Sequence, residues 1–259
     1  MCLILFAYKI HPNYRLILAA NRDEFYNRST APLDYWAEHP DVLAGRDLIG
    51  NGTWLGVNRT GRIAALTNFR ERGAQMQKAP SRGALIHNYL TADSAPLHYL
   101  KEVRNIGHIY NGFNLITGDT DGLFYYSNRA TRIHKLKPGF YGISNHFLDT
   151  SWPKVKIGKV RLQGQLNAHE KIDPEKIFKI LSDRSMPIDD ELPDTGVGLQ
   201  WERILSPLFI TSSEYGTRSS SIVLIATSGQ VTIMERTFLK TANEIKKGAT
   251  RKYSFRINN

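Results

Sequence analysis

The sequence predicts an α+β domain with a large, mainly antiparallel sheet, or two such sheets stacked. Short apolar and β-branched segments dominate both ends of the chain, and helical patterns lie between them. Hydrophobic residues make up 41% of the 259 residues, which is enough apolar material for a substantial core. No tandem repeat or low-complexity linker interrupts the chain. We therefore expect residues 1–259 to fold as a single cooperative domain.

The first third of the chain has the pattern of two hairpins. Leu3–Tyr8 and Tyr14–Ala20 are apolar segments, and the residues between them, His11-Pro12-Asn13, are typical of a turn. Trp54–Asn58 and Arg62–Asn68 repeat the pattern. Each pair is expected to form two antiparallel strands.

Helical patterns occupy the middle of the chain. Ser81–Leu90 is predicted to be a helix capped by Ser81, and Pro96–Val103 a second, shorter one. Asp173–Ile180 has a capping residue followed by proline, which is typical of a helix start. Trp152–Leu166 fits a helix only in part, because some of its apolar residues lie off one face.

Other segments complete this description. Ser185–Gly198 is predicted to be a loop, and the last twenty residues are basic with little periodicity. Further strands are expected at Phe113–Thr117, Leu123–Ser127, Arg132–Leu136, Phe140–Ile143, Leu208–Ile210, Ser221–Thr227 and Val231–Phe238.

The single cysteine, Cys2, directly follows Met1. Removal of Met1 would leave one residue with both a thiol and a free α-amine, whose ordinary pKa values are roughly 8.5 and 7.7–8.0. Such a residue carries its own nucleophile and its own base. The alternative is that Cys2 is a small apolar residue opening a buried strand. A chain with one cysteine forms no internal disulfide, which suits a reducing, cytoplasmic location.

Four polar residues, Asn21-Arg22-Asp23-Glu24, directly follow the second apolar segment. If the first two strands pair as a hairpin, Asp23 lies near Cys2 at the open end. The alternative is an exposed turn. Asn68 and Asn145 also stand at predicted strand ends, and Arg218 precedes a hydrophobic strand. Neutral amides at rigid strand ends are suited to stabilising an oxyanion, although Asn is also common in turns.

The formal net charge is +10. It indicates either ordinary solubility or attraction of an anionic small molecule. Nucleic-acid modules are not recognisable, and no apolar segment reaches membrane-spanning length. The eight histidines show no metal-ligand spacing, so no metal site is predicted; His146, beside Asn145, is the histidine of most interest.

Several short motifs in order along the chain resemble the NRDE family, of the transport and Golgi organisation type. The motifs are Ala20-Asn21-Arg22-Asp23-Glu24-Phe25, Ala44-Gly45-Arg46-Asp47, Gly52-Thr53-Trp54-Leu55-Gly56-Val57-Asn58, Thr67-Asn68-Phe69-Arg70, Ser144-Asn145, Trp152-Pro153-Lys154 and Tyr215-Gly216-Thr217-Arg218. Together they cover nearly the whole chain.

A more distant similarity links the pattern to N-terminal-nucleophile (Ntn) hydrolases of the choloylglycine hydrolase and penicillin V acylase kind. It implies a four-layer αββα sandwich of two mainly antiparallel sheets. It also implies roles for Cys2 as nucleophile, Asp23 as the carboxylate that holds the amine, Asn68 and Asn145 as oxyanion donors, and Arg218 as the late arginine. The family's earlier arginine falls at Ala20, and Arg22 is a candidate replacement. Substrate contacts are predicted at Asn21, Arg22, Arg70 and His146.

Three functions are compatible with the sequence. The first is an N-terminal-cysteine amidohydrolase acting on linear C–N amide or ester bonds of a small amphipathic, possibly anionic molecule, with no required cofactor. The second, implied by the family resemblance, is non-enzymatic binding and trafficking of haem or of an acyl carrier or lipid. The third, a nucleic-acid partner, has only the pI of about 9.6 in its favour.

Overall fold

The computed structural model describes residues 2–73, 76–167, 172–241 and 244–258. The chain forms two compact units, each with one antiparallel sheet and its own helices. Unit 1 contains Met1–Asn27, Lys137–Ser144 and Leu148–Ser254; unit 2 contains Arg28–Leu136, Asn145–Phe147 and Phe255–Asn259. The predicted class, α+β with two mainly antiparallel sheets, is confirmed. That the whole chain unfolds as one cooperative domain stays a prediction.

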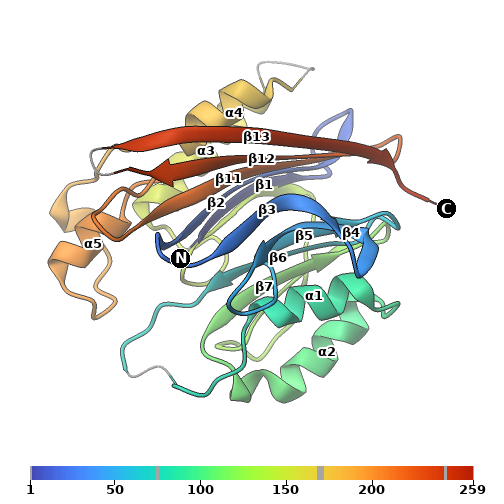
Figure 1. Cartoon of the computed structure of the whole chain (residues 1–259), viewed down its shortest axis with the longest axis horizontal. Coiled ribbons are helices and arrows are strands. Elements are labelled where there is room, and N and C mark those ends of the chain that lie inside the picture. Colours follow the sequence, from blue (N-terminus) through green and yellow to red (C-terminus); the bar gives the residue numbers. More distant parts are fainter. Residues whose placement is uncertain (1, 74–75, 168–171, 242–243, 259) are drawn as a thin grey trace. The chain divides into compact units, whose positions relative to one another are not determined.

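Unit 1 is built on a six-stranded sheet with the order β10-β1-β2-β11-β12-β13 (Figure 1). The strands are β1 (Cys2–Tyr8), β2 (Tyr14–Phe25), β10 (Gly139–Ile143), β11 (Tyr215–Ala226), β12 (Gln230–Lys240) and β13 (Ile245–Arg256). The predicted hairpin of β1 and β2 is confirmed. β2 extends five residues further than predicted, so its polar residues 21–23 lie inside the strand and are buried, not in an exposed turn.

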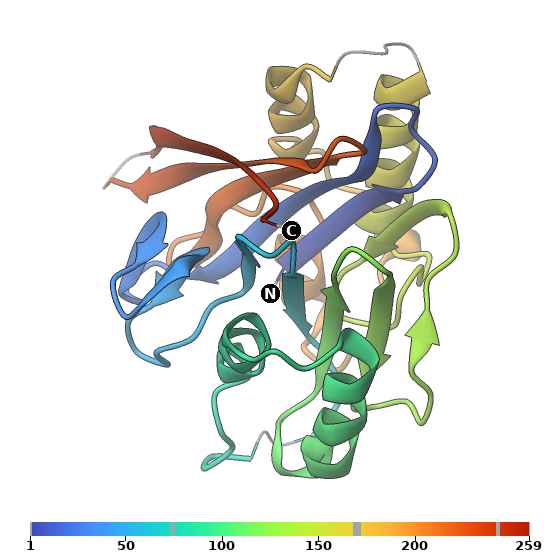
Figure 2. The ribbon, with the colours of Figure 1, turned by 90° about the vertical axis from the view of Figure 1, so that its right-hand side faces the viewer.

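Two helices, α3 (Pro153–Asn167) and α4 (Pro174–Leu181), lie side by side on one face of this sheet (Figure 2). Their apolar residues pack on alternate residues of β1 and β2, such as Leu5 and Ile17. The segment Trp152–Leu166, whose sequence fits a helix only in part, thus lies almost entirely in a helix. Gly158 explains its irregular pattern, because a Cβ there would lie 2.6 Å from Leu5 Cδ1, so the helix approaches the sheet closely at this point.

One strand prediction is wrong. Leu208–Ile210 is not a strand; it is a buried irregular segment after helix α5 (Leu199–Leu205), and side chains satisfy part of its backbone. The basic C-terminal segment, whose sequence shows little periodicity, pairs with β12 as the terminal strand β13. The predicted loop Ser185–Gly198 contains a short 3₁₀ helix, Asp189–Glu191.

Unit 2 is built on a seven-stranded sheet with the order β3-β4-β5-β6-β7-β8-β9. The strands are β3 (Thr30–Trp36), β4 (His39–Asp47), β5 (Leu55–Asn58), β6 (Ile63–Asn68), β7 (Phe113–Gly118), β8 (Leu123–Ser127) and β9 (His134–Lys135). β5 and β6 form the second predicted hairpin, whereas β9 is shorter than predicted.

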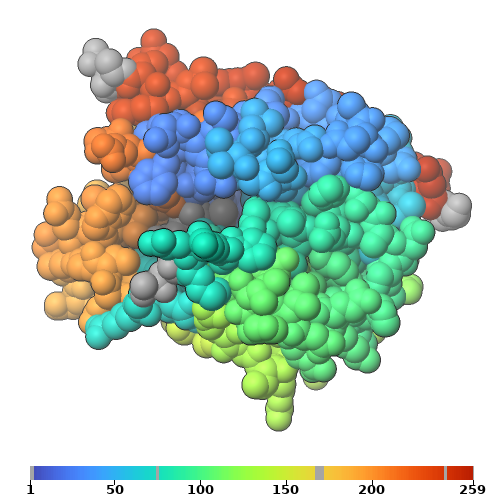
Figure 3. Space-filling view, turned by 60° about the horizontal axis from the view of Figure 1, so that its bottom comes forward, coloured from blue at the N-terminus to red at the C-terminus, as the bar shows by residue number. Residues whose placement is uncertain are grey.

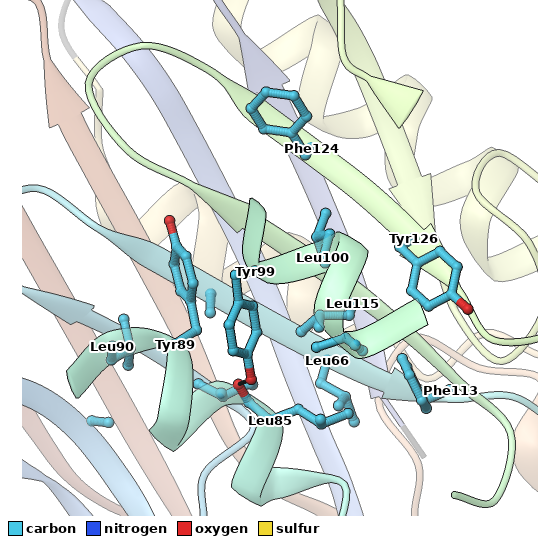
Figure 4. Close-up of a cluster of buried hydrophobic side chains, with 14 of the residues drawn as sticks. Leu66, Leu85, Tyr89, Leu90, Tyr99, Leu100, Phe113, Leu115, Phe124 and Tyr126 are labelled. Carbon is cyan, nitrogen blue, oxygen red and sulfur yellow. Dashed lines mark hydrogen bonds between the residues drawn. The ribbon is translucent and has the colours of Figure 1, made fainter. Parts of the chain in front are cut away.

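Helices α1 (Gly83–Thr91) and α2 (Pro96–Ile106) cover one face of this sheet. Their outer surface forms the teal and green region of Figure 3. Ser81 is not the N-cap of α1; Arg82 is, and it makes no side-chain capping bond. Beneath the helices lies a core of aliphatic and aromatic side chains (Figure 4). There the Tyr99 hydroxyl donates to the carbonyl oxygen of Leu85 at 2.6 Å, which ties α2 to α1.

No helix within the described residues is long and apolar enough to span a membrane.

Substitution of two glycines in the same helix tests the packing of α3. Gly158→Leu should lower the free energy of unfolding by about 1–3 kcal/mol, because it overpacks the contact with Leu5. Gly164→Leu is the matched control: no atom lies within 4 Å of a Cβ at Gly164, so better helix propensity should add about 0.5–1 kcal/mol. Urea denaturation measures both, and equal effects would contradict this packing.

Candidate active site

The strand register of unit 1 places the first residue of β1 beside the polar end of β2. Cys2 is the Cα partner of Arg22, whereas Ala20 is the partner of Ile4. Directly paired Cα atoms in an antiparallel ladder lie about 4.5–5.5 Å apart. Arg22, and not Ala20, is therefore the β2 residue directly across from Cys2.

A β-bulge in β11 lies next to this point. Asp23 pairs with Thr217 and Arg22 pairs with Ser219, which leaves Arg218 as the extra residue. Bulges re-aim a side chain and are frequent near functional sites. The Arg218 guanidinium donates from Nη1 to the carbonyl oxygen of Phe25 at 2.8 Å.

The carboxyl group of Asp23 is buried in unit 1, with the residue only 1% exposed. Its Oδ1 accepts a 2.7 Å hydrogen bond from the hydroxyl of Thr217, and that hydroxyl accepts a 2.9 Å bond from the backbone N–H of Ile210. Because the Ile210 N–H fixes the hydroxyl as an acceptor, its single hydrogen is directed at Asp23. Thr217 thus holds this carboxyl group in one orientation.

Burial raises the pKa of Asp23 above its ordinary value, and the positive charge of Lys154 and the bond from Thr217 offset part of that rise. Lys154 is itself buried and donates from Nζ to the carbonyl oxygen of Leu205 at 3.0 Å. A buried carboxyl group is therefore accompanied by a buried ammonium group.

Asn21 uses its amide within the protein. Nδ2 donates to the carbonyl oxygens of Leu181 and Leu208, and Oδ1 accepts from the hydroxyl of Ser220. The side chain thereby fastens β2 to the end of α4 and to the irregular segment that follows α5. A substrate contact at Asn21 stays a prediction, whereas its structural role is evident.

Two arginines increase the positive charge at this end of the sheet. Burial lowers the pKa of Arg218, and the positive charge of Arg22 lowers it further. Arg22 is 5% exposed. The negative charge of Glu24 acts on Arg218 in the opposite direction and raises its pKa.

A second group of predicted residues lies within unit 2. The Asn145 side chain donates from Nδ2 to the carbonyl oxygen of Asn68 at 2.9 Å, and the backbone N–H of Arg70 donates to the carbonyl oxygen of Asn145 at 2.7 Å. Asn145 is fully buried, while Asn68 is half-buried at the end of β6. Within the described part of the chain, the Asn68 side-chain amide makes no hydrogen bond.

His146 belongs to the same group. Its ring lies 4.9 Å from that of Phe69, and burial lowers its pKa. Its carbonyl oxygen accepts from Asn114 Nδ2, which also donates to the hydroxyl of Thr67. Asn114 therefore fixes the loop that carries Asn145 and His146 to the centre of the sheet of unit 2.

Three buried polar residues were missed: Lys154 and Thr217 in unit 1, and Asn114 in unit 2. Lys154 and Thr217 fall in motifs that the sequence singles out, but the motifs do not reveal the bond from Thr217 to Asp23 or the effect of Lys154 on the pKa of Asp23. Asn114 interrupts an apolar strand, and a polar residue at a buried strand position is the signal that would have found it. No three metal-ligating side chains lie close enough together, among the residues described, to hold a metal ion.

The fold and this arrangement define an α+β protein with a buried polar cluster at the start of its chain. The family model described as "Transport and Golgi organisation 2" matches residues 1–240. A mouse (Mus musculus) protein named "Transport and Golgi organization 2 homolog" is 35% identical, covering 99% of both chains. The chain belongs to this family, as its motifs predicted.

Two similar solved structures are an amidase and an acylase by name. One is the Caenorhabditis elegans ortholog of N-acylethanolamine-hydrolyzing acid amidase, 11% identical with a TM-score of 0.47, covering 86% of this chain and 92% of that one. The other is penicillin V acylase from Agrobacterium tumefaciens, 15% identical with a TM-score of 0.47, covering 89% of this chain and 82% of that one.

Substitution of Thr217 tests whether its hydroxyl holds Asp23. Thr217→Val keeps the shape but removes the partner of both Asp23 and the Ile210 N–H, so the free energy of unfolding should fall by about 1–3 kcal/mol. Thr217→Ser keeps the hydroxyl and should retain most of the stability. Guanidinium denaturation of both variants measures these effects; a Thr217→Val variant as stable as the wild type would contradict this role of the hydroxyl.

Proposed function

We propose that the protein is an N-terminal-cysteine amidohydrolase that acts on a linear amide or ester of a small amphipathic molecule. The observation that carries this proposal is the register: Cys2 lies directly across from Arg22, and the next residue of β2 is the buried Asp23. After removal of Met1, a cysteine in this register near a held carboxyl group would have the components of an N-terminal nucleophile site.

The proposed reaction begins after removal of Met1. The α-amine of Cys2 takes the proton of its own thiol, and the sulfur attacks the carbonyl carbon of the substrate. The protonated amine then gives that proton to the leaving nitrogen or oxygen, which leaves an acyl thioester. Water, deprotonated by the same amine, attacks the thioester and releases the acid and the thiol. Asp23 orients the amine in this scheme.

Stabilisation of the oxyanion is assigned to Asn68 and Asn145. The half-buried amide of Asn68 has no competing partner in the described protein, and Asn145 is tied to the backbone of Asn68. A neutral donor on a rigid strand end suits a charge that develops only in the transition state. Arg70 and His146, on the same segments, remain predicted substrate contacts.

The substrate in this proposal is possibly anionic. Arg22 and Arg218 bring positive charge to this end of the sheet, beside the carboxylate of Glu24, and positive charge attracts an anionic group. The same observation favours a second candidate function, in which the protein binds and carries an anionic molecule such as haem or an acyl carrier without cleaving it. A cytoplasmic location stays a prediction.

Cys2→Ala separates the two functions. If the protein is a hydrolase, this variant should cleave a panel of fluorogenic acyl amides and esters at least roughly a thousand-fold more slowly than wild type, because the nucleophile is gone. Intact mass spectrometry of the wild type should show that Met1 is absent, since the mechanism needs a free amine on Cys2.

The control is folding and ligand binding by the same variant. Cys2→Ala should unfold at the wild-type temperature, so that lost turnover reports on chemistry. Retained turnover in Cys2→Ala would contradict the hydrolase function, and so would an active wild type that keeps Met1. If neither the wild type nor Cys2→Ala shows turnover and both bind an acyl-carrier or haem ligand equally well, the binding and carrying function is favoured.

A further inference from the structure

We propose that Ser219 is a further substrate-contacting residue of the candidate site: its buried hydroxyl, in line with Arg22 across β2 and β11, donates a hydrogen bond to an anionic oxygen group of the substrate. This inference deepens the proposed function and rests on its placement of the substrate beside Cys2. The contact itself can be measured without any turnover.

Ser219 lies on the face of the unit 1 sheet that is turned away from helices α3 and α4. Ile222 and Leu224 of β11 pack in the core cluster under those helices. Because side chains alternate along a strand, Ser219 and Ser221 project from the opposite face. Ser219 is the strand partner of Arg22, and directly paired residues share a face of the sheet. The hydroxyl and the guanidinium group are therefore neighbours.

This face changes from aliphatic to polar along its length. Its aliphatic part includes a row of three paired residues, Leu18, Val223 and Ile233. Its polar part contains four residues that are each at most 5% exposed: Arg22, Ser219, Ser221 and Glu235. Burying polar groups costs free energy unless they are hydrogen-bonded, so packing of an apolar core does not explain the polar part.

The hydroxyl of Ser219 is buried without a hydrogen bond. Ser219 is 4% exposed, and none of the described residues supplies a partner for its Oγ. The adjacent Ser220, on the other face, donates from its Oγ to Asn21 Oδ1 at 2.6 Å. Buried hydroxyls ordinarily have partners, because an unmade hydrogen bond away from water lowers stability. A ligand group that accepts from Ser219 would remove this cost.

The charges around Ser219 indicate which group it binds. Arg22 is its direct strand partner, and Arg218, the extra residue of the bulge, precedes it in β11. Negative charge comes from Glu24 on β2 and from Glu235 on β12, which lies one row further along the sheet. The guanidinium group, and not the carboxylate of Glu235, is thus in the row of the hydroxyl. A hydroxyl beside a guanidinium group is suited to donate to an anionic oxygen.

The candidate nucleophile lies in the same row. Cys2 pairs with Arg22, and Arg22 pairs with Ser219, so the three residues are in line across β1, β2 and β11. Paired Cα atoms lie about 4.5–5.5 Å apart, which places the Cα atoms of Cys2 and Ser219 roughly 10 Å apart. A short chain of atoms joined to the sulfur can span that distance.

The first measurement separates a ligand contact from a structural role. Ser219→Ala should unfold at a urea midpoint equal to or above that of the wild type, because the hydroxyl it removes makes no bond within the described protein. Ser220→Ala is the matched control, since the same change on the same strand breaks the bond to Asn21 and should lower the midpoint. Equal losses in the two variants would overturn the inference.

The second measurement uses methanethiosulfonate reagents on Cys2, the only cysteine. The thiolate attacks the sulfenyl sulfur, a mixed disulfide forms and methanesulfinate leaves. The 2-sulfonatoethyl reagent carries an anionic acceptor, the 2-(trimethylammonio)ethyl reagent carries a cation, and the methyl reagent carries neither. Ser219→Ala should slow the sulfonatoethyl reagent at least about threefold relative to the methyl reagent, and should leave the ratio for the cationic reagent unchanged.

Three results would overturn the inference. The first is an unchanged ratio of sulfonatoethyl to methyl rates in Ser219→Ala, and the second is an equal loss for the anionic and the cationic reagent. The third is a native protein whose Cys2 does not react with the methyl reagent. A protein that shows the expected rates but cleaves no amide or ester would refute only the proposed function.

Discussion

The burial of one carboxylate imposes the main constraint on unit 1. Asp23 lies at the polar end of a central strand, where an unpartnered charge would cost several kcal/mol. The Thr217 hydroxyl from β11 donates to this carboxyl group, and the positive charge of Lys154 offsets part of the rise in its pKa. Because the same hydroxyl accepts from the backbone N–H of Ile210, this contact also holds the irregular segment after α5 against β11.

The sheet of unit 1 also holds its first strand, β1, firmly in place. Terminal residues are ordinarily loosely held unless they are part of a sheet. Here the first strand pairs along its full length with β2 and from Ile4 onward with β10, and its alternate residues pack under two helices. Cys2 is thereby kept in register with Arg22. In unit 2, Asn114 has the same role for the loop of Asn145 and His146.

Local patterns were sufficient for the first hairpin, for the strand end at Asn68 and for most helices, because turn residues and apolar periodicity act over a few positions. They failed where distant partners decide the outcome. The polar residues 21–23 look like a turn, yet β2 continues because Thr217, 194 residues away, satisfies Asp23. Leu208–Ile210 is apolar but not a strand, since side chains bind its backbone. The basic end of the chain gains its strand conformation from pairing with β12.

The central proposal is that Asp23 tunes Cys2 once Met1 has been removed. Since Cys2 is the only cysteine, alkylation by iodoacetamide reports on its thiolate alone. An ionised carboxylate that holds the α-ammonium group should lower the pKa of the thiol beside it. The account predicts that Asp23→Asn raises the pH midpoint of alkylation by about one unit or more, while exposed Asp190→Asn leaves it unchanged. Identical pH profiles for wild type and Asp23→Asn would contradict the account.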